Sequence, residues 1–154
     1  MSTIASGGST RAESVRNGMN AVDGRTHIVV VHDGARPLVS CDEITLTIEA
    51  AKQRGAACLV RKVTDTVKEV ADGQIVGTVD RSNLRHALTP QAFRKEIIDE
   101  ALSERNFDPS ATDECFLVEK LGRSIAFVEG SSRNIKVTLS DDLTVAEALL
   151  KSTV

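Results

Sequence analysis

A run of β-branched residues in the stretch THIVVVHDGARP, residues 26–37, constrains the fold of this chain more than any other feature. Ile28 to Val31 is uninterrupted, and such a run predicts a strand buried on both faces, as in a parallel sheet. The loop after it carries Asp33, Gly34 and Arg36, at the strand end where ligands of open α/β sheets bind. Asp33 could hold a metal ion or a hydroxyl group, Gly34 could let a ligand approach closely, and Arg36 could grip a phosphate. The alternative is a loop in which Arg36 only pairs with Asp33.

Length and composition favour a globular enzyme or binding domain. The chain has 154 residues, of which 41% are hydrophobic, enough for one domain with a real core. A net charge of −3 and the lack of Trp and Tyr argue against a nucleic-acid partner. No apolar run approaches the length of a membrane span, and the polar N-terminus lacks the apolar core of a signal peptide. The three scattered cysteines, Cys41, Cys58 and Cys115, predict buried, reduced thiols and a cytoplasmic protein, with a cysteine nucleophile as the alternative.

Helices and strands alternate along the chain. Thr10 and Glu13 predict the start of one helix, and the stretch from Ser40 to Arg54 predicts a second, followed by a strand over residues 56–61. Strand, helix and strand with short connections predict a parallel α/β unit. Further elements are expected as a helix from Thr89-Pro90, a short helix over 111–122, strands over 124–129 and 134–137, and a last helix capped by Ser140. We find no repeat and no linker, and expect one domain over residues 1–154.

Residues 63–79 depart from this alternation. They alternate loosely and contain Asp72-Gly73, which is a hairpin-turn signal, and a second tight turn follows at residues 80–83. The resulting arm, residues 63–85, has too little apolar surface to stand alone. A partner subunit is the natural surface for it to pack on, and the alternative is an excursion that folds back on its own domain.

Several polar residues lie at the ends of these elements, and each has an ordinary explanation. Thr89 and Thr112 could be helix caps, Arg81 a solvated turn residue, and Lys136 a surface residue of a strand. Their order carries more information than any one of them. The series GGSTRAESVRNGM, VVVHDGARP, VTDTVK, TVDRSNLRHALTPQAF, ATDE and GSSRNIKVT closely resembles the 2-C-methyl-D-erythritol 4-phosphate cytidylyltransferases of the non-mevalonate isoprenoid pathway.

This resemblance implies an activity and a fold. The family joins CTP to methylerythritol phosphate with Mg²⁺ and releases pyrophosphate, so CTP would be a co-substrate and a divalent cation a cofactor. The implied fold is α/β, a Rossmann-like nucleotidyltransferase sheet of the glycosyltransferase-A-like kind, with helices on both faces, an inserted hairpin arm that dimerises, and the N-terminal strands missing. A homodimer through residues 63–85 is implied, with neither nucleic acid nor membrane as a partner.

The resemblance also assigns residues. Those that would hold CTP are Gly8, Ser9, Ser14, Asp33 and Gly34, although the family often has an acid where this chain has Ser9. Those that would bind the polyol phosphate are Asp33, Arg36, Thr66, Arg81, Thr89, Thr112 and Lys136. Arg81 and Lys136 would be catalytic, because two phosphates must meet and fixed cations offset their repulsion. Thr66 and Arg81 lie in the arm and would act in the neighbouring subunit.

One family feature has no match. The family begins with a strand and a glycine-rich loop, with an arginine and a lysine, that wraps the CTP triphosphate. The chain resembles the remaining two thirds, as a mis-called start, a fragment or a truncated protein would. We therefore expect this chain alone to show no measurable CTP-dependent pyrophosphate release. The alternatives in function are a cytidylyltransferase for a polyol phosphate such as ribitol 5-phosphate, and a non-catalytic dimerisation or binding fragment.

Overall fold

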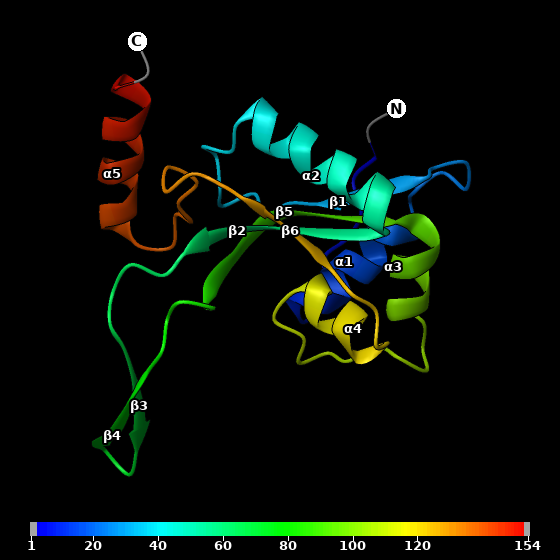
Figure 1. Cartoon of the computed structure of the whole chain (residues 1–154). Coiled ribbons are helices and arrows are strands. Elements are labelled where there is room, and N and C mark those ends of the chain that lie inside the picture. The colour runs from blue at the N-terminus through cyan, green and yellow to red at the C-terminus, as the bar shows by residue number, and fades with distance from the viewer. Residues whose placement is uncertain (1–2, 153–154) are drawn as a thin grey trace.

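The computed structural model describes residues 3–152, which form a four-stranded sheet, helices on both of its faces and a separate hairpin (Figure 1). The elements, in chain order, are α1 (Arg11–Met19), β1 (Ile28–Val31), α2 (Cys41–Arg54), β2 (Ala56–Lys62), β3 (Val67–Ala71), β4 (Gln74–Val79), β5 (Arg85–Arg94), α3 (Lys95–Ala101), α4 (Glu114–Lys120), β6 (Ala126–Glu129) and α5 (Ser140–Lys151).

The sheet is mixed and has the order β1-β5-β2-β6. β5 runs antiparallel to β1 and to β2, whereas β2 and β6 are parallel. The expected unit of β1, α2 and β2 is present, and its two strands point the same way, but β5 lies between them. This placement suits β5, because its residues 88–93 are all buried, as a central strand requires.

Helices cover both faces of the sheet, as expected for the fold class. On one face α2 packs Ala51 against Ala57 and Ala92, three small residues that let the helix approach closely. On the other face α1, α3 and α4 enclose the larger core, which includes the fully buried Phe93 and Ile98 (Figure 1). The helices packed on the two faces of the sheet fix the loops at the end of β1, where the candidate site lies.

Local signals at the two N-terminal helices are confirmed. The Thr10 side chain accepts a hydrogen bond from the Glu13 amide at the start of α1. Ser40 and Glu43 form a full capping box at the start of α2, which ends at Gly55 with a φ of 94°. These caps involve residues three positions apart, so the sequence alone was sufficient to locate them.

Two predicted elements are wrong. Thr89-Pro90 does not begin a helix but lies inside β5, joined by a cis peptide bond, and the helix begins later, at Lys95. The preference of proline for the start of a helix does not decide the structure here, because Leu88 to Phe93 is buried between β1 and β2. Residues 134–137 form no strand; one backbone hydrogen bond, from the Val137 amide to the Ala35 carbonyl at 2.8 Å, attaches this segment to the loop after β1.

Two burial predictions also fail. Val30 is 37% exposed, so β1 is not buried on both faces; within residues 3–152 it pairs only with β5 and therefore lies at a sheet edge. Cys58 and Cys115 are buried as expected, but Cys41 is exposed because it is the first residue of α2, directly after its cap.

The hairpin of β3 and β4 projects away from the sheet (Figure 1). Its turn is where the sequence predicts it, at Asp72 and Gly73, which have φ values of 49° and 75°. Within the described part of the chain these strands pair only with each other, and Val70, Ile75 and Val76 are exposed. No helix formed by residues 3–152 is long and apolar enough to cross a membrane.

Candidate active site

Asp33 is the centre of a cluster of charges just beyond β1. Its Oδ1 accepts hydrogen bonds from the Nε and Nη2 of Arg11 at 3.2 and 3.1 Å. Its Oδ2 lies 3.2 Å from the Nζ of Lys136 and 3.5 Å from the Nε of Arg36. Burial alone would raise the pKa of the Asp33 carboxyl, but the hydrogen bond from Lys136 and the charge of Arg11 outweigh it and lower the pKa below its ordinary value. Asp33 is therefore held as a carboxylate among three cations.

Arg11 connects this cluster to a buried acid. Its guanidinium donates two hydrogen bonds, of 2.6 and 3.0 Å, to the carboxylate of Glu114, the first residue of α4. The Glu114 side chain is 1% exposed, and this burial raises its pKa although Arg11 opposes the change. Burial would lower the pKa of Arg11, because it disfavours the charged form, but the two acidic partners outweigh it and raise the Arg11 pKa. Arg11 thus bridges α1, the β1 loop and α4, and holds their relative positions.

Thr89 of β5 fixes the backbone of the same loop. Its Oγ1 accepts a hydrogen bond from the Asp33 amide at 3.0 Å and lies 3.0 Å from the Nδ1 of His32. The Thr89 carbonyl in turn accepts from the Nδ2 of the buried Asn134 at 3.0 Å. The Asn134 carbonyl accepts from Arg36 at 3.0 Å. This chain of bonds ties β5, the β1 loop and the 134–137 segment together, so a strand is not needed to place Lys136.

Gln91 performs a similar role on the α4 side. Its Nε2 donates to Asp113 at 2.9 Å, and its Oε1 accepts from the amide of Cys115 at 3.2 Å. Asp113 also caps α4 by accepting from the amide of Phe116. Since Gln91 is 1% exposed, it sets where the start of α4, including Thr112, lies against the sheet.

These residues enclose a pocket of about 210 Å³ at the strand ends. Its lining includes five residues predicted to bind the polyol phosphate, contributed by four separate segments: Asp33, Arg36, Thr89, Thr112 and Lys136. The charged residues that line it include three cations, Arg11, Arg36 and Lys136. The pocket therefore offers charge-assisted donors for a phosphate and a carboxylate that can accept from hydroxyl groups.

The residues predicted to hold CTP lie outside this pocket, apart from Asp33. The amide of Gly8 donates to the Oγ of Ser14 at 3.0 Å, and Ser9 binds the Glu13 carboxylate through its amide at 2.7 Å and its hydroxyl. A side chain at Gly8 would collide with Glu13, so this loop folds tightly onto the start of α1. Gly34 is exposed, with open space where a side chain would be.

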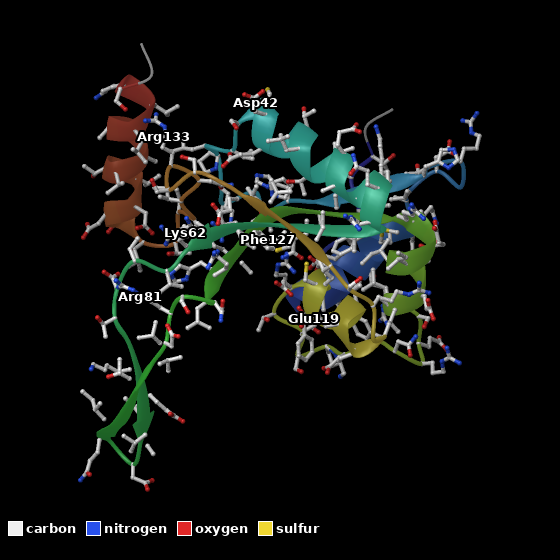
Figure 2. The ribbon with its side chains drawn as sticks, viewed as in Figure 1. Asp42, Lys62, Arg81, Glu119, Phe127 and Arg133 are labelled. Atoms are coloured by element: carbon white, nitrogen blue, oxygen red, sulfur yellow. The ribbon has the colours of Figure 1, made fainter. Side chains whose placement is uncertain are left out.

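The two predicted residues of the arm also lie outside the pocket. Thr66 is exposed just before β3, and Arg81 lies at the base of the hairpin, where it donates to the carbonyl of Thr64 (Figure 2). Neither lines the pocket of its own chain.

Sequence reasoning assigned no role to Arg11, Gln91 or Glu114. All three lie within the motifs GGSTRAES, TPQAF and ATDE, so the signal that marked the motifs also covered them. What the sequence did not reveal is their pairing, since Arg11 and Glu114 are 103 positions apart.

The fold and this pocket together define a class: a mixed α/β protein with a pocket at the strand ends, lined by cationic and acidic side chains, and a projecting hairpin. The family profile described as 2-C-methyl-D-erythritol 4-phosphate cytidylyltransferase matches residues 2–152. The chain belongs to this family.

Comparisons with individual relatives point to the same family. The cytidylyltransferase of that name from Pelotomaculum thermopropionicum is 47% identical over 154 residues, which are 99% of this chain and 65% of the relative. The crystal structure of the Thermus thermophilus protein superimposes with a TM-score of 0.85 at 36% identity, over 94% of this chain and 71% of that one. The Francisella tularensis structure gives 0.83 at 37% identity, over 93% and 69%. The chain thus spans about 65% of the length of the curated relative from Pelotomaculum thermopropionicum.

Proposed function

We propose that the protein transfers a cytidylyl group from CTP to 2-C-methyl-D-erythritol 4-phosphate, in the synthesis of isoprenoid precursors. An oxygen of the polyol phosphate attacks the α-phosphorus of CTP, the bond from that phosphorus to the oxygen bridging the α- and β-phosphates breaks, and pyrophosphate leaves. The products are CDP-methylerythritol and pyrophosphate. Family membership supports the reaction type, and the pocket supports the acceptor.

One observation carries the proposal. Five residues that the family pattern associates with the polyol phosphate come from four distant segments and line the same pocket. Within it, Asp33 is ionised and can accept from polyol hydroxyls, while Thr89 and Thr112 offer hydroxyl groups. Lys136 lies beside Asp33 and is 43% exposed in its side chain, so its ammonium is available to a phosphate as well.

The chemistry asks the protein mainly for placement and charge. Both reacting phosphates are anionic, and fixed cations lower the energy of their approach in a site shielded from water. In the proposal Lys136 and Arg81 hold the attacking phosphate, and Gly8, Ser9, Ser14 and Gly34 hold the cytosine and ribose of CTP. The open space at Gly34 and the exposure of Gly8 and Ser9 support nucleotide contact from this side.

The donor set of the pocket bears on magnesium. Asp33 is already in contact with three cations, and among residues 3–152 no group of three His, Cys, Asp or Glu side chains could hold a metal ion. The residues of this pocket therefore do not fit a protein-only magnesium site. We propose that Mg²⁺ binds with the triphosphate, whose oxygens and water supply most of its ligands.

We also propose a homodimer through the arm, residues 63–85. Its strands pair only with each other in the described residues, and its apolar residues Val70, Ile75 and Val76 are exposed, so the arm needs a surface to pack on. A second copy would place its own Arg81 and Thr66 near the Asp33 pocket, which they do not reach in their own chain. The remainder of residues 1–154 is proposed to act as one domain.

The test uses the chain joined to the N-terminal segment of the Thermus thermophilus relative, hereafter the joined chain. Pyrophosphate release is measured with CTP and either methylerythritol phosphate or ribitol 5-phosphate. We expect turnover with the first and far less with the second. Equal turnover with ribitol 5-phosphate would contradict the proposed substrate, and binding of neither polyol phosphate would contradict the proposed function.

A further inference from the structure

The pairing of β2 with β5 puts cations on both faces of the sheet. Arg61 lies opposite His86, and the next pair along is Lys62 opposite Arg85. Because successive residues of a strand point to opposite faces, the two pairs face opposite ways. On one face Lys62 and Arg85 lie 3.8 and 3.4 Å from the Glu129 carboxylate, which both of them share. The pair on the other face has no such acid.

Arg61 and His86 line a cavity of about 340 Å³ next to the Asp33 pocket. The two cavities share four lining residues, Arg36, Ala87, Leu88 and Lys136, which form the wall between them. A ligand that contacts Asp33 can therefore extend past Lys136 toward Arg61.

Residues that line this second cavity carry buried polar atoms that are unsatisfied. Four buried side-chain atoms have no hydrogen-bond partner among the described residues: the Nε atoms of Arg61, Arg36 and Arg85, and the Oδ1 of Asn134; of these residues only Arg85 does not line this cavity. Asn134 is 1% exposed, and Arg36 Nε lies 3.5 Å from Asp33 in an ion pair that lacks hydrogen-bond geometry. These atoms are closed off from the cavity itself, so a ligand would contact the terminal nitrogens of the Arg61 guanidinium, which are suited to anionic oxygens.

The one acid in the lining, Asp142, keeps its negative charge but forms no ion pair with Arg61. The Oδ2 of Asp142 accepts from the Thr138 amide at 2.8 Å, the Thr138 hydroxyl at 3.0 Å and the Leu139 amide at 2.8 Å. These bonds, with that of the Thr138 amide the largest cause, lower the Asp142 pKa and hold its carboxylate against the start of α5. Within residues 3–152 Arg61 forms no ion pair, so the cavity keeps an excess of positive charge.

We propose that Arg61, with His86 opposite it, binds the phosphate group of the polyol phosphate and makes the site specific for a phosphorylated acceptor. The proposal rests on the function proposed above and adds a residue to it. The planar guanidinium presents its two terminal Nη groups to two phosphate oxygens, while Lys136 reaches the same group from the wall between the cavities.

The test compares Arg61→Leu with Lys62→Leu, which removes the same charge from the neighbouring position on the other face. Calorimetric titrations use methylerythritol phosphate, unphosphorylated methylerythritol and inorganic phosphate. We expect Arg61→Leu to weaken binding of methylerythritol phosphate about 10- to 100-fold, the value of a charged hydrogen bond, and to weaken inorganic phosphate similarly. Binding of the unphosphorylated polyol should not change, and Lys62→Leu should leave all three ligands unaffected.

Arg61→Lys guards against misfolding, since it keeps the charge and the long stem. It should bind methylerythritol phosphate with intermediate affinity, because a point charge replaces the fork. Wild-type affinity in Arg61→Leu, or an equal loss in Lys62→Leu, would overturn the inference.

Inorganic phosphate separates this inference from the proposed function. If the wild type fails to bind methylerythritol phosphate but binds inorganic phosphate in a way that Arg61→Leu abolishes, the proposed function is wrong and the anion site stands. If the wild type binds neither, both are wrong.

Discussion

Asp33 and Arg81 are both predicted to bind the same substrate, yet their surroundings differ in almost every respect. The Asp33 side chain is 14% exposed and contacts three cations contributed by three segments of the chain. Arg81 is exposed at the base of the hairpin, and its side chain donates to one backbone carbonyl nearby (Figure 2). The pocket is thus organised by the core of its own chain, whereas the strands of the arm pair only with each other among residues 3–152.

The contrast has an energetic meaning. Charges in the pocket are partly removed from water, so the loss of one partner leaves the others poorly compensated. Charges in the arm are hydrated, so changing them should affect assembly and catalysis but hardly the stability of one subunit. Five experiments test this contrast.

The largest effect on stability is expected for Arg11→Leu. This change leaves Glu114 buried without its cation and removes one partner of Asp33. We expect a loss of about 3 kcal/mol in the free energy of unfolding, measured by urea denaturation at neutral pH. Arg25→Leu is the control, because the Arg25 side chain is 91% exposed in its pair with Asp23 and its loss should change little. A difference of only a few tenths of a kcal/mol between the two variants would contradict the view of a core-supported pocket.

The largest effect on activity is expected for Lys136→Ala and Arg81→Ala in the joined chain. Each should lower kcat/KM for methylerythritol phosphate about 100-fold, whereas CTP affinity should change far less, because other residues hold the nucleotide. Arg81→Lys should not restore activity, since a lysine lacks the fork of the arginine.

Mixing the two alanine variants tests whether the arm acts across subunits. If Arg81 serves the partner's pocket and Lys136 its own, a mixed dimer has one site with both changes and one with neither. Activity should then partly return. Exchange of subunits without any recovery would show that the two residues do not share a site in this way.

A moderate, pH-dependent effect is expected at Asp33. Because its pKa is lower in the folded protein than the ordinary value near 4, its ion pairs stabilise the fold fully above that value. This contribution is lost as pH falls through the folded-state pKa and the carboxylate is protonated. Urea denaturation at pH 7, 5 and 3 should show that the difference between wild type and Asp33→Asn shrinks toward the lowest pH. A difference that stays constant would mean that the charge of Asp33 does not contribute.

The smallest effect on subunit stability is expected for Ile75→Asp in the arm. Ile75 is 67% exposed, so we expect a change within about 0.5 kcal/mol in the unfolding free energy of the subunit. Light scattering should instead show loss of the dimer. Lys68→Asp, on an exposed residue of β3 bonded to Thr78, separates the loss of apolar contact from the change of charge. A dimer that survives Ile75→Asp would place the interface elsewhere.

Features that depend on a few neighbouring residues could be predicted from the sequence. The capping box of Ser40 and Glu43 and the turn at Asp72 and Gly73 are each specified by residues within four positions of each other. The ordered motifs were also sufficient to indicate the family and five residues of one pocket. The order of motifs along a chain can be recognised without knowledge of the fold.

The tertiary structure decided what depends on distant neighbours. Pro90 lies in a strand because residues 88–93 are buried between β1 and β2, against its preference for the start of a helix. Arg11 finds Glu114 across 103 positions, and Arg61 faces His86 only because of the register between β2 and β5. Burial and register arise when the sheet assembles, so no local pattern of residues specifies which charges are neutralised and which remain open to a ligand.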